Sequence, residues 1–413
     1  MKVRETVRED GLRIISGRVP SKKVYLNLIA GVGSAHDPEN KKGLFHYFEH
    51  MAFKGTEKRS IEDIGSFTRR NLLDGNASTK KLTTSYYVEA VSRKFSLLCE
   101  YLCDIYFHSV FPKSEIEREK EVILNEIARD NDDDHYRAYF ALWEQLWTQN
   151  PLRASEVGSP EGVKNVSRDD LLSAREHWYV PSNTVALAIG RIDHDDFVAE
   201  LGRHIPIDSA AIEHRTWNDE YGALPQKPEV IIELPEREKA IFLLGFKFPF
   251  YNDEKTAVLT KFLQFLLVCR PTSRLWNEVR EKRGLSYALN GGVCCDYQLG
   301  HYFHVYVETF PQRVEEVQEL VKGLLMKPLD DSDEFEEMKE WLYDWYTLNP
   351  ETLDEWSAFI VDALNRGVSP KTAERYLSRM SKLISSVSLD EVEDLRRLSM
   401  NPEQFVSVIV RPT

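Results

Sequence analysis

Short runs of apolar or alternating residues are separated by longer amphipathic segments along this chain, a pattern that predicts strands interspersed with helices. In the first half, we expect strands at Val24–Val32, Thr84–Val91 and Thr184–Gly190. In the second half, we expect them at Val230–Leu234, Ile241–Phe248, His301–Thr309 and Gln404–Val410. A polar, proline-containing stretch lies between the halves. The pattern therefore predicts domains at residues 1–210 and 229–413, with a linker at residues 211–228.

The two halves repeat one plan. Tyr-Val-Glu-Ala-Val, which ends at Val91, matches Tyr-Val-Glu-Thr-Phe, which ends at Phe310. The same offset places Ser114-Glu-Ile-Glu against Asp333-Glu-Phe-Glu. A chain of 413 residues is long enough for two domains, each with its own core. We expect an α+β fold of two homologous domains, each a mainly antiparallel sheet with helices packed on one face.

The run His46-Tyr-Phe-Glu-His50 carries the clearest chemical signal. It lies in an apolar segment, Leu44–Phe53, that follows turn residues and precedes Gly55, which predicts a helix. On a helix, residues four apart lie about 40° from each other around the axis, so His46 and His50 share a face and can bind one metal ion, usually zinc. Glu49 lies beside them, and His-x-x-Glu-His is the inverted zincin signature. This predicts metal-assisted hydrolysis of a peptide bond.

A second predicted helix, Ser114–Arg129, supplies further carboxylates. Glu119 and Glu126 are seven residues apart in it and so lie on one face. By composition alone, a solvated acidic helix face is the favoured interpretation, because spacing does not show that either residue meets the histidines.

The stretch Gly-Leu-Phe-His-Tyr-Phe-Glu-His-Met-Ala-Phe-Lys-Gly-Thr, residues 43–56, resembles the signature of the M16 metallopeptidases, which include pitrilysin, insulin-degrading enzyme and the mitochondrial processing peptidase. In that family, a third zinc ligand is a Glu on a later helix, and at the family's spacing from the second His this chain has Glu126. A functional Glu seven residues earlier matches Glu119. The resemblance thus implies one zinc per chain held by His46, His50 and Glu126, with Glu49 as the general base that activates water and Glu119 orienting a ligand histidine.

The resemblance also implies substrate contacts. Asn76 and Ala77 match an edge to which the family's substrates add as an extra strand, although Ser78 stands where the family usually has an aromatic residue. Without the family, Gly75-Asn76 is equally well explained as a turn. Arg280 and Tyr287 match a pair that binds substrate carbonyls and stabilises the oxyanion; otherwise they are a surface Arg and a core Tyr.

In the family, two chains of this length close into a chamber, with the Arg/Tyr pair reaching the zinc of the opposite subunit. We therefore expect a zinc-dependent endopeptidase for short or unfolded peptides, most simply a homodimer. One alternative is a heterodimer with a second M16-like chain that matures a single precursor. The other is a non-catalytic partner subunit, although the residues at positions 46, 49, 50, 119 and 126 all match the family.

Charge and cysteine content narrow the remaining possibilities. A net charge of −14 argues against nucleic-acid binding. The charged start lacks the apolar run of a secretory signal, and no stretch approaches the length of a membrane span. Five cysteines without Cys-x-x-Cys spacing suit reduced thiols, so we expect a cytoplasmic protein.

Overall fold

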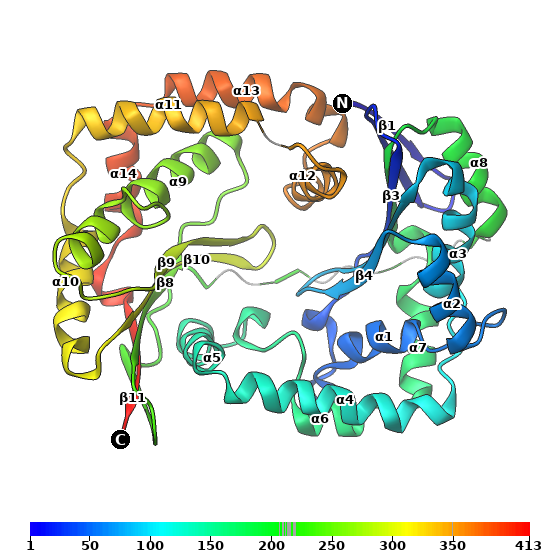
Figure 1. The fold of residues 1–413 in the computed structure, drawn as a ribbon, viewed down its shortest axis with the longest axis horizontal. Coiled ribbons are helices and arrows are strands. Elements are labelled where there is room, and N and C mark those ends of the chain that lie inside the picture. Colours follow the sequence, from blue (N-terminus) through cyan, green and yellow to red (C-terminus); the bar gives the residue numbers. More distant parts are fainter. Residues whose placement is uncertain (206, 209, 211, 213–215, 218–219, 349) are drawn as a thin grey trace. The chain divides into compact units, whose positions relative to one another are not determined.

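The structure is a computed structural model that describes the whole chain except residues 206, 209, 211, 213–215, 218–219 and 349 (Figure 1). It divides into two compact units. Unit 1 comprises Met1–Arg129, Ser155–Arg215 and Pro350–Glu374. Unit 2 comprises Asp130–Ala154, Thr216–Asn349 and Arg375–Thr413. The units differ from the predicted domains because each contains one segment from the other half of the sequence, and the predicted linker at 211–228 lies partly outside the described residues.

Unit 1 contains a six-stranded sheet with the order β1-β2-β6-β3-β5-β4. The pairs are antiparallel except for β2 with β6. The strands are β1 (Lys2–Val7), β2 (Arg13–Arg18), β3 (Lys23–Ala30), β4 (Asp74–Thr79), β5 (Thr84–Val91) and β6 (Thr184–Gly190). Three of them were predicted, whereas β1, β2 and β4 were not.

The helices of unit 1 cover both faces of this sheet. They are α1 (Leu44–Ala52), α2 (Ile61–Asn71), α3 (Phe95–Phe107), α4 (Lys113–Asp132), α6 (Pro160–Asn165), α7 (Arg168–Trp178), α8 (His194–His204) and α12 (Leu353–Asn365). Most pack on the face that buries alternate residues of β3 such as Leu26 and Leu28. The opposite face, with Tyr25 and Leu187, is covered by Leu353 and Ile360 of α12. A helix from the second half of the sequence therefore completes the first unit.

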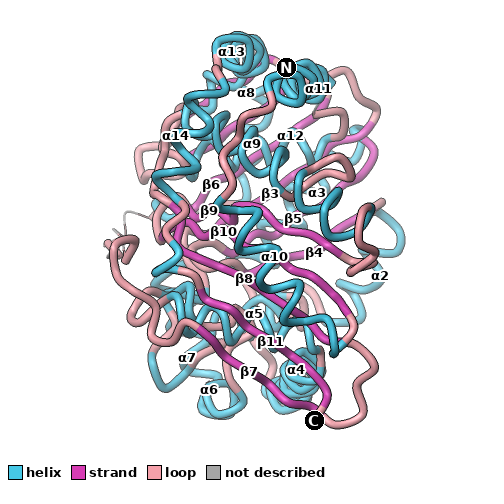
Figure 2. The backbone as a smooth tube through the Cα atoms, turned by 90° about the vertical axis from the view of Figure 1, so that its left-hand side faces the viewer, coloured by secondary structure: helices cyan, strands magenta, loops and turns pink. Residues whose placement is uncertain are grey.

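Unit 2 is built on a five-stranded sheet with the order β7-β11-β8-β10-β9, in which only β7 and β11 run parallel (Figure 2). Its strands are β7 (Glu229–Leu234), β8 (Ala240–Phe248), β9 (Leu289–Asp296), β10 (Gly300–Thr309) and β11 (Val406–Pro412). Its helices are α5 (Asp134–Leu146), α9 (Glu254–Leu267), α10 (Val314–Met326), α11 (Ser332–Leu348), α13 (Ala373–Ser386) and α14 (Leu389–Ser399). Strand β9 was not predicted, whereas the other four were.

The internal repeat predicted from the sequence is visible in the elements. Helix α3 begins at Phe95 and α10 at Val314, and the starts of α5 and α12, Asp134 and Leu353, are separated by the same length of chain. Helices α5 and α12 are exchanged between the two units. Helix α5, from the first half of the sequence, packs on β8 and β11, whereas α12, from the second half, packs on β3 and β6. The α+β fold with two mixed, mainly antiparallel sheets is confirmed, but each sheet has a helix on its second face as well.

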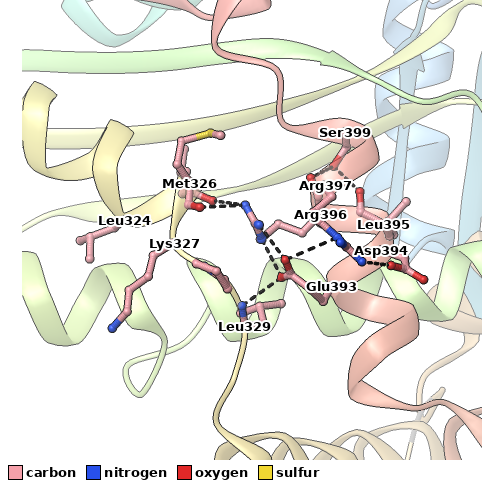
Figure 3. Close-up of polar contacts among 12 residues, drawn as sticks. Leu324, Met326, Lys327, Leu329, Glu393, Asp394, Leu395, Arg396, Arg397 and Ser399 are labelled. Atoms are coloured by element: carbon pink, nitrogen blue, oxygen red, sulfur yellow. Dashed lines mark hydrogen bonds and ion pairs between the residues drawn. The ribbon is translucent and has the colours of Figure 1, made fainter.

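A buried arginine joins two helices of unit 2 (Figure 3). Arg396 of α14 is only 4% exposed and makes two hydrogen bonds of 2.7 Å to the Glu393 carboxylate. It also donates to the carbonyl oxygens of Leu325 and Met326 at the end of α10, which have no partner within that helix. Pairing and hydrogen bonding together offset the cost of burying this charge.

Among the residues described, no helix is both long and apolar enough to cross a membrane.

We predict that Ile360→Ala destabilises unit 1 by about 2–4 kcal/mol, because it empties the fully buried contact between α12 and the sheet. The measurement is the urea midpoint followed by tryptophan fluorescence. Leu398→Ala, at a position that is 67% exposed, is the control and should change stability by less than about 0.5 kcal/mol. Equal effects of the two substitutions would contradict the packing of α12 described above.

Candidate metal centre

The start of helix α1 is fixed by Asp37. Its carboxylate accepts hydrogen bonds from the backbone N–H groups of Gly43 (2.7 Å) and Phe45 (3.1 Å), which the helix itself leaves unpaired. Gly43 has φ +99°, and a Cβ there would lie 2.7 Å from the carbonyl oxygen of Val157, so this position requires glycine. Burial raises the pKa of Asp37 to about 7. These contacts fix the position at which α1 begins.

Helix α1 has one face in the core and another that carries His46, Glu49 and His50. The core face consists of Phe45, Tyr47, Phe48 and Met51, each at most 1% exposed. The Tyr47 hydroxyl donates a hydrogen bond to the backbone carbonyl of Ile116 in α4. This bond joins the helix of the histidines to the helix of the glutamates.

His46, His50 and Glu126 converge. The Oε2 atom of Glu126 lies 3.6 Å from His50 Nε2 and 3.9 Å from His46 Nε2, and the two imidazole centroids are 4.6 Å apart. The three candidate ligand atoms all lie within 4.8 Å of one another. Within the described ranges of the chain, this is the one group of three or more His, Cys, Asp or Glu side chains that is close enough to hold a metal ion.

The geometry and charge of this group fit a zinc ion. Separations of 3.6 and 3.9 Å are too long for hydrogen bonds. They are close to the separation of about 3.3 Å between ligand atoms that bind one tetrahedral zinc at roughly 2.0–2.1 Å. Burial and the neighbouring His50 lower the pKa of His46 to about 3, so this imidazole is neutral, as a ligand must be. Two imidazoles and one carboxylate form a common catalytic zinc set.

Glu119 precedes Glu126 on α4 and contacts the other side of His50. Its Oε1 is 2.9 Å from His50 Nδ1, and its Oε2 is 2.7 Å from the Lys54 ammonium. Burial acts to raise the pKa of Glu119, but the hydrogen bonds from His50 and Lys54 outweigh it and hold that pKa below its usual value. Lys54 had no role in the sequence-based prediction, because no local pattern links residues 54 and 119.

Glu49 lies on the same helix as the histidines and is held by strand β4. The Thr79 hydroxyl donates a 2.6 Å hydrogen bond to Glu49 Oε2. Burial raises the pKa of Glu49 above its usual value, and the hydrogen bond from Thr79 opposes this shift. The contact between Thr79 and Glu49 was not predicted from the sequence.

The predicted substrate segment is the edge of the sheet in unit 1. Asn76 and Ala77 lie in β4, the last strand in the order, which pairs with β5 on one side. Strand β4 also packs against α1. The turn interpretation of Gly75-Asn76 is therefore wrong, because both residues pair with β5.

Arg280 and Tyr287 lie together in unit 2, in and just after a π-helical turn at Trp276–Glu281. The Arg280 guanidinium stacks 4.3 Å from the Trp276 ring centroid and 4.9 Å from that of Tyr287, and it donates to the Tyr287 carbonyl (3.1 Å). Tyr287 is 83% exposed, so it is not the core tyrosine of the alternative interpretation. Stacking and the hydrogen bond hold the Arg280 guanidinium beside the Tyr287 ring, so two side chains that can donate hydrogen bonds lie next to each other.

Among its described residues, the second unit carries no copy of the metal group. At the offset of the internal repeat, His46 and Glu126 correspond to Phe265 and Trp345. Phe265 packs edge-on against Trp341 at 5.1 Å, and Trp341 stacks with Trp345. An apolar aromatic cluster therefore lies where the first unit has its ligands.

Comparison with known proteins agrees with this division. Residues 13–159 match the family described as insulinase (peptidase family M16), and residues 165–342 match the peptidase M16 inactive domain. An "Uncharacterized zinc protease" of Rickettsia felis is 27% identical over 332 residues, 79% of this chain and 78% of that protein. The "Uncharacterized zinc protease YmxG" of Bacillus subtilis is 25% identical over 418 residues, 98% of this chain and 97% of its own.

Solved structures share the fold along the whole chain. A protease from Helicobacter pylori matches with a TM-score of 0.89 and 17% identity, covering 100% of this chain and 99% of its own. A peptidase M16 inactive domain from Pseudomonas fluorescens matches with a TM-score of 0.88 and 17% identity, covering 100% and 98%. The paired domain matches, the relatives named as zinc proteases and the His-His-Glu group lead to one conclusion: this chain belongs to peptidase family M16 and is a zinc protease.

Proposed function

We propose that this chain is an endopeptidase that cleaves short or unfolded peptides inside a chamber closed by two subunits. The observation that supports the catalytic part most strongly is the convergence of His46, His50 and Glu126 beside Glu49. A non-catalytic subunit is disfavoured, because the complete set of site residues is present. The three candidate ligands lie together, Glu119 contacts His50, and Glu49 contacts Thr79.

His46, His50 and Glu126 would hold the zinc ion, which when bound supplies Lewis acidity and an activated water. Glu49 acts as the general base that takes a proton from the attacking water and then delivers it to the leaving amine. Thr79 holds Oε2 of Glu49 and so limits the orientations of that carboxylate. Glu119 keeps Nδ1 of His50 engaged, which directs Nε2 toward Glu126.

Strand β4 is the element on which we propose that the substrate docks. Its outer edge carries backbone groups near Asn76 and Ala77. The Ala77 N–H donates to Asn76 Oδ1 (2.9 Å), a contact that an added peptide strand would replace with little demand on its own side chains. Because Thr79 of the same strand contacts Glu49, a peptide on this edge would run toward the general base. Such binding favours extended or unfolded peptides over folded proteins.

We infer that two copies of the chain form the chamber and that Arg280 and Tyr287 of one copy serve the metal group of the other. The exposed phenol of Tyr287 and the partly buried guanidinium of Arg280 stacked on it are suited to an oxyanion or to substrate carbonyls. We also infer a cytoplasmic location, which five cysteines that form no disulfide support.

We predict that Glu49→Gln retains zinc but lowers kcat/KM by about 10²–10⁴-fold, because the amide keeps the shape of the side chain and cannot accept the proton. The measurement pairs zinc analysis by atomic emission with cleavage of an internally quenched peptide chosen from a library that the wild-type chain cuts. Cleavage at the wild-type rate by the zinc-loaded variant would show that Glu49 is not the base.

A mixing experiment tests the shared site. Glu49→Gln and Arg280→Ala chains should each be inactive alone, but subunit exchange at equal ratio should restore about a quarter of wild-type activity, since half of the dimers then contain one intact site. Peptide cleavage across a series of mixing ratios is the measurement. No recovery at any ratio would mean that each chain uses its own Arg280 or none.

A further inference from the structure

The Glu119 carboxylate is held at both oxygens in a nearly closed site. Its side chain is 6% exposed, with Oε1 at 2.9 Å from His50 Nδ1 and Oε2 at 2.7 Å from Lys54 Nζ. Among the residues that the structure describes, Lys54 is the one Lys or Arg that pairs with Glu119. We propose that Lys54 is a positioning residue of the metal centre, which acts through Glu119 to fix the ring of His50.

The backbone of Lys54 is itself held in place. Its N–H bonds to the Met51 carbonyl at the end of α1 (3.1 Å). The next residue, Gly55, has φ +145° and accepts a hydrogen bond from the Val110 N–H (3.1 Å). Thr56 then pairs with Ser109 in an isolated bridge. The ammonium of Lys54 therefore extends from a fixed point, and its side chain is 23% exposed.

Two-point attachment explains why this lysine matters for geometry. A carboxylate held at one oxygen can rotate about its last torsion, which is broad and roughly two-fold. With the second oxygen bound to Lys54, that rotation would break a charge-assisted hydrogen bond to a carboxylate that is only 6% exposed. The acceptor for His50 Nδ1 therefore stays in one place, and the ring presents Nε2 toward Glu126 at 3.6 Å.

The ion pair of Glu126, the metal-group glutamate on α4, shows by contrast that Lys54 is not in an ordinary surface ion pair. Glu126 pairs with Arg129 at 3.7 Å, and the Arg129 side chain is 75% exposed. Lys54 binds at 2.7 Å to a carboxylate that solvent scarcely reaches. An exposed pair contributes little, whereas removing one partner of a buried pair leaves an uncompensated charge.

This inference rests on the proposed zinc chemistry and is tested by metal affinity rather than turnover. In competition with a chromophoric chelator, Lys54→Met should raise the zinc dissociation constant about 10-fold, the effect typical of losing a contact behind a ligand histidine. Lys54→Arg, which keeps the charge and donors, should recover most of the affinity. Lys58→Met is the matched control, because Lys58 is an exposed lysine four residues later and makes no contact with Glu119.

A double-mutant cycle separates positioning from general destabilisation. In a Glu119→Gln chain, adding Lys54→Met should change zinc affinity by less than about twofold, since Lys54 acts through the carboxylate that is already lost. Thermal unfolding of each zinc-free chain identifies variants that do not fold, and if Lys54→Met does not fold, Lys54→Gln replaces it. Wild-type affinity in Lys54→Met, or an equal loss in both backgrounds, would overturn the role of Lys54. Failure of the wild-type chain to bind zinc would instead overturn the proposed function.

Discussion

The contact between helices α1 and α4 is the constraint on which the metal centre depends. The two histidines come from one helix and the glutamate from another, so the ligand set exists only if these helices meet at a fixed rotation and height. The hydrogen bond from Tyr47 to the Ile116 carbonyl sets one point of that contact, and the bond between His50 and Glu119 sets a second. The cap from Asp37 fixes where α1 begins. Each contact buries a polar group with a partner, which makes slippage costly.

The second unit has the same order of elements but, among its described residues, lacks the polar contacts that position the metal ligands in unit 1. It repeats the order of elements, as α3 and α10 illustrate, yet its corresponding positions hold Phe265 and Trp345. Helices α9 and α11 pack through apolar contacts such as that of Phe265 with Trp341. These contacts do not require polar side chains at fixed positions. The family description of an inactive domain for residues 165–342 agrees with this specialisation. Packing therefore suffices for the fold, whereas the metal centre requires the additional polar contacts of unit 1.

Much of this could be predicted from the sequence because it is local. The pentad lies on one helix, so its spacing alone placed His46 and His50 on one face, and strands buried on their core side, such as β5 and β6, had readable patterns. Glu126 could be named only through the family resemblance, since spacing does not show which helices meet. Strands β1, β2, β4 and β9 were not predicted from the residue pattern. Of these, β1 is rich in charge, and β4 contains the weak strand formers Asp74, Gly75 and Asn76.

Contacts between distant segments that the family resemblance did not name could not be predicted. Thr79 meets Glu49 and Lys54 meets Glu119 only because strand β4 and helix α4 pack against α1, and neither pair has a sequence pattern. The exchange of α5 and α12 was missed for a similar reason. An amphipathic helix shows which of its own faces is apolar, but not which sheet that face covers. The duplication was readable, but the assignment of these two helices to opposite units required the structure.

The most direct test of the account is the location of zinc in crystals of the zinc-loaded protein, from anomalous scattering at the zinc absorption edge. The account predicts one strong peak per chain within about 2.0–2.2 Å of Nε2 of His46, Nε2 of His50 and a carboxylate oxygen of Glu126. A peak bonded to other side chains, or to the histidines with Glu126 turned away, would contradict it.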